Sequence, residues 1–280
     1  MKKLLAILLT LALSLSFTAA LADTVTIGVP NDTTNEARAL LQQANGIIKL
    51  AMGSGIQATV RDIVENPYNV EIVEIEAAQL PVQLPDLDYA VINSNYAISA
   101  DLNPVKDSLL LEGSYSAYGN ILAVKEGTEE SDKVKALVAA LESKQVADFI
   151  TETYNGSVVS TVENPTDGYD ATVDYDALKG QKITVAASPT PHAEILKVAQ
   201  EILAAKDVEL EIVEFTDYVQ PNLVVDNGEI DANYFQHLPY LEDFNAENGT
   251  KLVSVSVIHG EPMGLYGGRQ TTLDALGLSK

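Results

Sequence analysis

Two stretches of this sequence repeat one order of strand, turn and helix. The first opens with the apolar run of residues 25–29, and the second opens with residues 183–187. In both, a polar turn and a helical pattern come next, followed by a second strand, a short helix and a third strand. Strands that alternate with helices predict parallel pairing and right-handed crossovers, so we expect two α/β lobes. The second strands nearly match, as Ile72-Val73-Glu74-Ile75 and Ile212-Val213-Glu214-Phe215.

The predicted lobes divide the chain unevenly. We expect lobe one at residues 23–112 and lobe two at residues 113–280, each with a mostly parallel sheet flanked by helices. Residues 160–180 are polar and acidic, and we interpret them as a surface linker. A chain of 280 residues with a hydrophobic fraction of 46% can give both lobes a core.

Polar and aromatic residues collect after the predicted strands. In parallel sheets, ligands bind beyond the carboxyl ends of the strands. Two such edges that face each other would form a clamshell that closes on a small molecule. The segments concerned are residues 31–38, 93–96, 188–192, 216–218 and 233–240.

Charge and cysteine content exclude several classes of partner and site. Lys and Arg total 17 against 40 Asp and Glu, a formal net charge of -23, which argues against nucleic acid and anionic membrane surfaces as partners. The chain has no cysteine, so disulfides, thiolate nucleophiles and Cys metal sites are excluded. With only three scattered histidines, we predict no metal site and no cofactor.

The N-terminus has the pattern of a secretory signal peptide. Lys2 and Lys3 precede an apolar run at residues 4–17, and Ala20-Leu21-Ala22 supplies small residues for cleavage. We therefore expect residues 1–22 to be removed; an uncleaved anchor is the alternative, although the apolar run is short for a bilayer span. Without a cysteine at the cleavage point to take a lipid, the expected location is periplasmic or secreted, with no membrane anchor.

The sequence closely resembles the methionine-binding proteins of bacterial ABC importers, the NlpA family. The resemblance covers nearly all of the chain after residue 22, and its motifs are long enough to be specific. Two long motifs carry it, Glu211-Ile-Val-Glu-Phe-Thr-Asp-Tyr-Val-Gln-Pro-Asn222 and Asp231-Ala-Asn-Tyr-Phe-Gln-His-Leu-Pro-Tyr240. Shorter matches are Val29-Pro-Asn-Asp, Asn35-Glu-Ala-Arg38, Asp62-Ile-Val-Glu-Asn-Pro67, Glu76-Ala-Ala-Gln-Leu-Pro81, Val91-Ile-Asn93 and Glu261-Pro-Met-Gly-Leu-Tyr266.

This resemblance implies a fold and a function. The fold would be a two-lobed, periplasmic-binding-protein-like clamshell of type II. The protein would capture methionine or a close amino-acid analogue between the lobes and deliver it to an ABC permease with its ATPase, and it would not be an enzyme. A secreted bilobal ligand sensor, which would report to a receptor rather than to a transporter, is one alternative. A hydrolase or transferase on the same scaffold is a further alternative, but the sequence lacks a nucleophile elbow and a convincing Ser-His-Asp set.

The order of the motifs departs from the family. Family members usually begin with the portion found here at residues 181–266, pass through a segment like Leu273-Asp-Ala-Leu276 and continue into the portion that starts here at Thr24. The chain therefore resembles a circular permutant, rejoined through residues 160–180. Such a rearrangement is tolerated where termini lie close together on the surface.

Three residues are predicted to hold the zwitterionic end of the ligand. Arg38, near a helix start at a strand edge, suits a bidentate grip on an α-carboxylate, a role that the resemblance also implies. An ordinary surface arginine is the alternative. Asn93 and Asn120 stand beside strands, and their amides offer both donor and acceptor. Asparagines in such places are otherwise turn formers, and the resemblance favours ligand contacts.

The resemblance assigns the ligand side chain to an aromatic pocket. Tyr218, Phe235 and His237 would enclose a thioether through sulfur–aromatic contacts. The alternatives are core packing for the two aromatic rings and a satisfied core histidine or a metal ligand for His237. Asn35 and Tyr240 are secondary candidates. Ala37 and Ser94 stand where family members often carry glycine, which leaves the details of the cleft and the exact ligand open.

Overall fold

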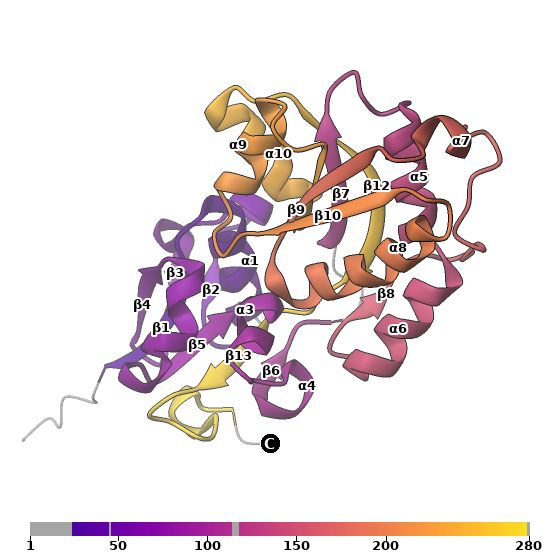
Figure 1. The fold of residues 1–280 in the computed structure, drawn as a ribbon. Coiled ribbons are helices and arrows are strands. Elements are labelled where there is room, and N and C mark those ends of the chain that lie inside the picture. The colour runs from indigo at the N-terminus through magenta and orange to yellow at the C-terminus, as the bar shows by residue number, and fades with distance from the viewer. Residues whose placement is uncertain (1–23, 45, 114–117, 279–280) are drawn as a thin grey trace, which may run out of the picture.

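Two sheets, each covered by helices, form two lobes (Figure 1). The computed structural model describes residues 24–44, 46–113 and 118–278. The predicted signal peptide, residues 1–22, lies outside the described residues. The two-lobed α/β fold predicted from the sequence is confirmed.

Lobe one is built on a five-stranded sheet with the order β4-β1-β5-β13-β6. Strands β4, β1 and β5 are parallel, whereas β13 runs antiparallel to both of its neighbours. The strands are β1 (Val25–Pro30), β4 (Val70–Ile75), β5 (Tyr89–Ile92), β6 (Ser108–Leu111) and β13 (Gly264–Gly267), and a separate small pair consists of β2 (Lys49–Leu50) and β3 (Ile63–Glu65). The helices are α1 (Thr33–Gln43), α2 (Leu80–Gln83), α3 (Ser94–Ser99) and α4 (Pro104–Asp107), with short turns η1 (Gly55–Gln57), η2 (Val60–Asp62), η3 (Ala77–Gln79), η4 (Leu84–Asp86) and η6 (Asp274–Leu276).

Lobe two is built on a six-stranded sheet with the order β10-β9-β11-β7-β12-β8. Strands β10, β9 and β11 are parallel, and the remaining neighbours pair antiparallel. The strands are β7 (Gly119–Lys125), β8 (Val159–Ser160), β9 (Lys182–Ala187), β10 (Glu209–Glu214), β11 (Ala232–His237) and β12 (Leu252–Gly260). The helices are α5 (Asp132–Leu141), α6 (Lys144–Tyr154), α7 (Tyr175–Leu178), the π-helical turn η5 (Pro189–Ala193), α8 (Glu194–Ala204), α9 (Gln220–Asp226) and α10 (Leu238–Asn248).

The repeat seen in the sequence occupies equivalent places in the two sheets. Strand β1 lies between β4 and β5, as β9 lies between β10 and β11. The matching residues even share a register, because Ile72 pairs with Ile27 and Ile212 pairs with Val185. The two repeated units therefore fold alike, one in each lobe.

An aspartate joins the inner strands in the same way in both lobes. Asp88, just before β5, accepts hydrogen bonds from the Thr26 backbone N–H (2.9 Å) and hydroxyl (3.1 Å). Asp231, just before β11, accepts the same two bonds from Thr184, at 2.8 and 3.1 Å. Charge-assisted bonds of this kind are stronger than neutral ones, so each aspartate helps to fix strand register. Each also pairs with a cation of its own lobe, Arg269 at 3.0 Å and Lys133 at 3.2 Å, respectively.

The sheets are mixed because the chain passes between the lobes twice, from β6 to β7 and from β12 to β13. A strand that arrives from the other lobe starts at the edge where the parallel strands end, so it must run antiparallel to them. Only three strands of each sheet follow the parallel pattern that the repeated units predicted.

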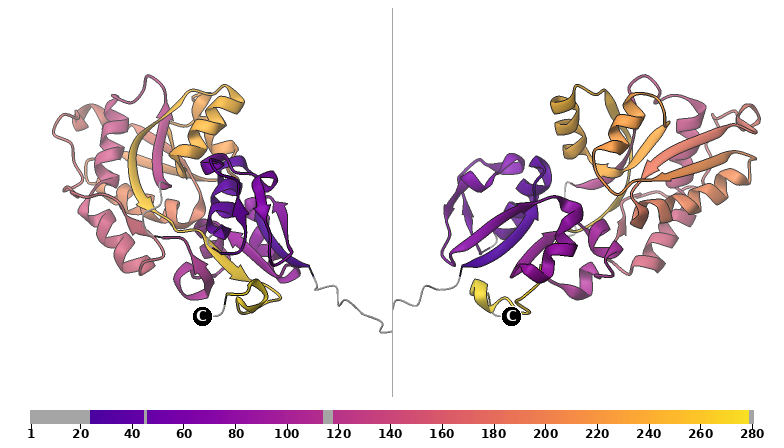
Figure 2. Two further views of the ribbon diagram at one scale, coloured as in Figure 1. Left: turned by 180° about the vertical axis from the view of Figure 1, so that it is seen from behind. Right: turned by 60° about the vertical axis from the view of Figure 1, so that its left-hand side comes forward.

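The predicted boundary of lobe two at residue 280 needs correction. Strand β13 pairs with β5 and β6 of lobe one, and Met263, Leu265 and Leu276 are fully buried in the core of that lobe. Figure 2 shows the C-terminal segment, in yellow, running from lobe two into lobe one. The apolar side chains of this segment complete a core that the first ninety residues of the lobe leave open, which is why it returns.

The predicted linker stays on lobe two and is more than a surface segment. It leads from β8 to β9, two strands of the same sheet, and it contains helix α7. Val173 and Leu178 are buried in the core beside α5 and α8, and the Tyr169 hydroxyl donates to the Ile202 carbonyl at 3.2 Å. The segment thus contributes packing as well as a connection.

Candidate functional site

A cavity lies where the carboxyl ends of the two sets of parallel strands face each other. Its empty volume of about 360 Å³ includes space that is open to solvent. All eight residues predicted from the sequence line it, Asn35, Arg38, Asn93, Asn120, Tyr218, Phe235, His237 and Tyr240. Five further described residues line it, Ser94, Asn95, His192, Gln236 and Glu261. The first four lie in segments that the sequence analysis placed at the strand ends, but none of the five was predicted as a ligand contact. The structure thus brings the predicted residues together, and their contact with a ligand stays a prediction.

Arg38 projects from α1 and is nearly completely buried. Its guanidinium already makes a bidentate contact with Glu112, whose carboxylate accepts hydrogen bonds from Nε at 3.0 Å and also from Nη2. Nη2 additionally donates to the Glu261 carbonyl at 2.7 Å, and the guanidinium carbon lies 4.6 Å from the centre of the Tyr118 ring. The two N–H groups of Nη1 make no hydrogen bond to the described residues. Arg38 can therefore offer Nη1, rather than its whole fork, to a ligand.

The amide groups of the cavity form a connected network. Asn35 Oδ1 accepts from Asn93 Nδ2 at 2.9 Å and lies 3.3 Å from His237 Nε2. His237 Nδ1 accepts the Tyr240 backbone N–H at 3.2 Å and so begins helix α10, which places the ring proton on Nε2. Asn93 Oδ1 is buried and has no hydrogen-bond partner among the described residues. An unused acceptor in a cavity wall is available for a ligand N–H group.

Aromatic rings form the opposite part of the wall. The Tyr218 and Phe235 ring centres are 5.8 Å apart, and those of Phe235 and Tyr240 are 6.1 Å apart. These distances suit tilted and edge-to-face aromatic packing. Phe244 of α10 and Leu223 of α9 support the cluster from behind. The predicted core-packing role and the predicted pocket role are therefore compatible, because the rings pack together and also face the cavity.

The two lobes touch across the cavity. The Thr34 hydroxyl donates to Asp243 Oδ2 at 2.6 Å, and the Tyr96 hydroxyl donates to the Thr216 carbonyl at 3.1 Å. The Tyr218 hydroxyl of lobe two also donates to Asn95 Oδ1 of lobe one at 2.7 Å. The structure is thus a closed arrangement of the lobes.

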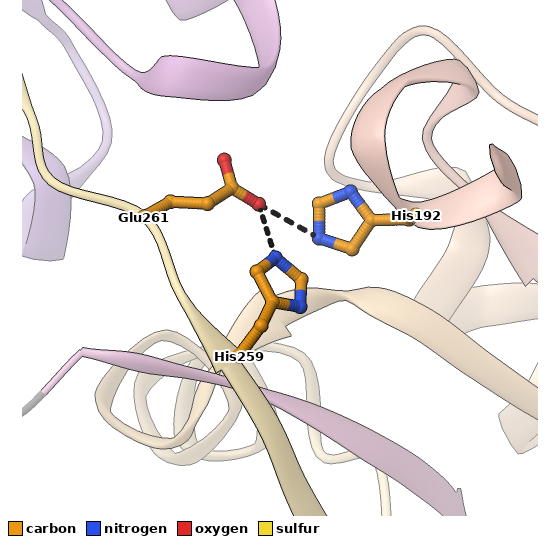
Figure 3. Close-up of side chains that lie close together, drawn as sticks. All are labelled: His192, His259 and Glu261. Carbon is orange, nitrogen blue, oxygen red and sulfur yellow. Dashed lines mark hydrogen bonds and ion pairs between the residues drawn. The ribbon is translucent and has the colours of Figure 1, made fainter. Parts of the chain in front are cut away.

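A buried group of two histidines and a glutamate contributes His192 and Glu261 to the cavity wall (Figure 3). The Nε2 atoms of His259 and His192 lie 2.7 and 3.3 Å from the same oxygen of Glu261. His259 Nδ1 is hydrogen-bonded to the Tyr234 hydroxyl, and His192 Nε2 also lies 2.8 Å from Asn120 Oδ1. Sequence reasoning missed this group because His192 is distant in the chain from His259 and Glu261, and none of the three stands in a recognisable metal motif.

Burial dominates the ionisation of this group. It lowers the pKa of His192 and of His259 to about 3, so both imidazoles are neutral at neutral pH. Burial also raises the pKa of Glu261, an effect that His192, Arg38 and the Asn95 backbone N–H oppose. Each of the three residues offers one ligand atom, all within 4.8 Å, so they could hold a metal ion. Their ring nitrogens are already hydrogen-bonded to the carboxylate.

The sequence pattern of one family matches most of the chain. The family is described as NlpA lipoprotein, and the matched residues are 15–162 and 183–279. This chain belongs to the NlpA lipoprotein family.

Relatives of this family member align with only part of it. The D-methionine-binding lipoprotein MetQ of Escherichia coli strain K12 is 42% identical over 50% of this chain and 52% of its own length. The membrane lipoprotein TpN32 of Treponema pallidum is 45% identical over 48% of this chain and 50% of its own length. The chain spans about half the length of the curated relatives it matches.

Solved structures of similar proteins also align with about half of this chain. A nutrient binding protein from Burkholderia cenocepacia, solved bound to methionine, is 46% identical with a TM-score of 0.47 and covers 50% of this chain and 61% of its own. The methionine binding protein MetQ is 42% identical with a TM-score of 0.47 and covers 48% of this chain and 56% of its own.

The family corrects the predicted location. We expected an unanchored periplasmic or secreted protein. The matching relatives are named lipoproteins, and one is named a membrane lipoprotein, so this prediction is wrong. Among the described residues, no helix combines the length and the apolar character needed to cross a bilayer.

Proposed function

We propose that this NlpA-family protein captures methionine, or a closely related amino acid, between its lobes and delivers it to an ABC permease with its ATPase. The observation that carries the proposal is the single buried cavity wall that combines Arg38, a set of amides and an aromatic cluster. The names of the relatives from Escherichia coli and Vibrio cholerae, both D-methionine-binding lipoproteins, support methionine as the ligand.

The chemistry of the wall suits such a ligand. The N–H groups of Arg38 Nη1, which make no hydrogen bond to the described residues, would donate to the α-carboxylate, and charge-assisted bonds of this kind are strong in a buried site. The rings of Tyr218, Phe235 and Tyr240 would contact the thioether, whose sulfur packs favourably against aromatic rings. The proposal therefore places Arg38 of lobe one at the carboxylate of the ligand and the aromatic cluster of lobe two at its side chain.

Binding and lobe closure would be coupled. A ligand held by α1 of lobe one and by the aromatic cluster of lobe two gains all of its contacts only when the lobes are closed. Differential affinity for the closed form is what shifts a conformational equilibrium. A micromolar dissociation constant corresponds to about −8 kcal/mol, enough to favour the closed state strongly. A permease that recognises the closed surface would then receive the loaded protein.

Titration calorimetry of the purified protein against the twenty amino acids and D-methionine tests the proposal. We expect methionine to bind most tightly and Arg38→Ala to weaken that binding at least about tenfold. Arg61→Ala is the matched control, because Arg61 is exposed and does not line the cavity. Circular dichroism would verify that each variant is folded. Tighter binding of an unrelated amino acid, or wild-type affinity in Arg38→Ala, would refute the assignment.

The proposal includes a circular permutation of the family's usual order. The family pattern matches in two segments, and the break at residues 163–182 coincides with the predicted linker. Val25 and Leu278 pack against the same core cluster of lobe one, so the present ends of the fold lie where an original connection could run. The linker itself begins and ends in the sheet of lobe two.

A rejoined chain tests the permutation. A short loop would connect residue 278 to residue 24, and new ends would be opened within residues 163–182. We expect this chain to fold and to bind the same amino acid with the same affinity, because no strand pairing changes. Failure of the rejoined chain to fold, while the natural order folds, would contradict the permutation.

A further inference from the structure

Glu261 stands at one of the two crossings between the lobes, directly after β12 and shortly before β13. Its side chain is 6% exposed and lines the cavity. Among the described residues that line the cavity, only Glu261 and Arg38 have charged side chains, and burial keeps His192 and His237 neutral at neutral pH. The cavity therefore presents one acidic and one basic group.

The side chains of Arg38 and Glu261 do not form an ion pair with each other. Arg38 contacts the backbone carbonyl of Glu261, while its bonds to a carboxylate go to Glu112. The Glu261 carboxylate instead contacts the Nε2 atoms of the two imidazoles and accepts a hydrogen bond from the Asn95 backbone N–H. Among the described residues, no Lys or Arg forms an ion pair with it. A buried carboxylate whose direct hydrogen-bond donors are all neutral is costly even with the Arg38 charge nearby, and a cation in the cavity would lower that cost.

The hydrogen-bonding groups of the cavity wall that have no partner among the described residues include both donors and acceptors. Arg38 Nη1 has two N–H donors with no bond to the described residues, and a carboxylate could accept both. Asn93 Oδ1 is a buried acceptor without a partner among them. An ammonium group brings three donors and needs acceptors such as this amide oxygen and a carboxylate. Figure 3 shows that the second oxygen of Glu261 points away from both imidazole rings.

We propose that Glu261, together with the Asn93 side-chain oxygen, binds the α-ammonium group of a zwitterionic ligand. The cleft then selects amino acids over carboxylic acids that carry the same side chain. This inference rests on the proposed function, since it names the group that recognises one end of the amino acid.

The test compares two ligands that differ only in the ammonium group, methionine and 4-(methylthio)butanoate. Glu261→Gln keeps the shape of the side chain and an acceptor for the imidazoles but removes the negative charge. We expect methionine affinity, measured by calorimetry, to fall about tenfold to a hundredfold, as for loss of a charged hydrogen bond. Affinity for the des-amino acid should change less than about threefold, because that ligand has no ammonium to lose.

Glu112→Gln is the matched control. It removes the carboxylate that pairs with Arg38 but does not line the cavity. Because it acts through Arg38, it should change the affinity for both ligands by the same factor. An equal loss for both ligands in Glu261→Gln, or no loss for either, would overturn the inference.

A measurement on the unaltered protein covers the case in which Glu261→Gln does not fold. The wild type should bind methionine at least about tenfold more tightly than 4-(methylthio)butanoate. Equal affinities would show that the ammonium adds nothing and would overturn the role of Glu261, while the proposed function stands. Absence of binding to every amino acid would instead overturn the proposed function, and the inference with it.

Discussion

Lowering the pH from 7 to 5 should destabilise this protein by an amount that its buried histidines determine. His192 and His259 each have a pKa of about 3 in the folded chain, against 6.5 for an ordinary histidine. Between these two pKa values the unfolded chain binds protons that the folded chain does not bind, so the free energy of unfolding falls as the pH falls. Stability from each histidine is fully present above pH 6.5 and is lost progressively toward pH 3.

The loss of unfolding free energy follows from the pH interval over which the unfolded chain binds more protons than the folded chain. From pH 6.5 to pH 5 each histidine contributes 1.5 pH units of unequal proton binding, or about 2 kcal/mol. His192 and His259 together should therefore lower the free energy of unfolding by about 4 kcal/mol, a large part of the stability of an ordinary domain. Burial also lowers the pKa of His237 well below 6.5, so this histidine adds to the loss. The raised pKa of Glu261 acts in the opposite direction, because a folded state that takes up a proton early gains stability as the pH falls.

Urea unfolding followed by circular dichroism, at pH 7 and at pH 5, measures this loss. The variant His259→Gln keeps a neutral donor toward Glu261 but cannot ionise. The difference between its two free energies of unfolding should be about 2 kcal/mol smaller than that of the wild type. Comparing the two losses, rather than the absolute stabilities, removes the effect of the substitution at neutral pH. The reasoning fails if the variant loses as much stability on acidification as the wild type does.

Three further predictions concern the fold. Asp88→Asn and Asp231→Asn should each lower the free energy of unfolding by about 1–3 kcal/mol. The two losses should be similar, because the two side chains accept the same bonds from a threonine of the neighbouring strand. Unequal losses in urea titrations would contradict the structural repeat. Gly268→Ala should destabilise lobe one strongly, since a Cβ there would lie 2.0 and 2.4 Å from two backbone oxygens, whereas Gly113→Ala meets nothing within 4 Å and should leave the melting temperature unchanged. Leu137→Ala, in the core of lobe two, should cost about 2–5 kcal/mol by urea unfolding, and a loss below about 1 kcal/mol would show that the site is loosely packed.

Residues close together in sequence carried most of what could be predicted. Period and turn signals placed strands β1, β4 and β5 and their counterparts β9, β10 and β11, because these depend on neighbouring residues. The candidate cavity residues followed from the same signals, since the ends of parallel strands must meet at one edge. Within those segments, the resemblance to the family singled out Tyr218, Phe235 and His237, and all three line the cavity.

The sequence by itself thus determined two repeated α/β units and the segments that face each other between them. Only the tertiary structure decided that β13 returns to lobe one, that Glu112 occupies the fork of Arg38, and that two histidines converge on Glu261. Each of these depends on side chains brought together from distant parts of the chain. Local patterns specify which face of an element is buried, but the partner it meets is chosen by packing and by the pairing of buried charge.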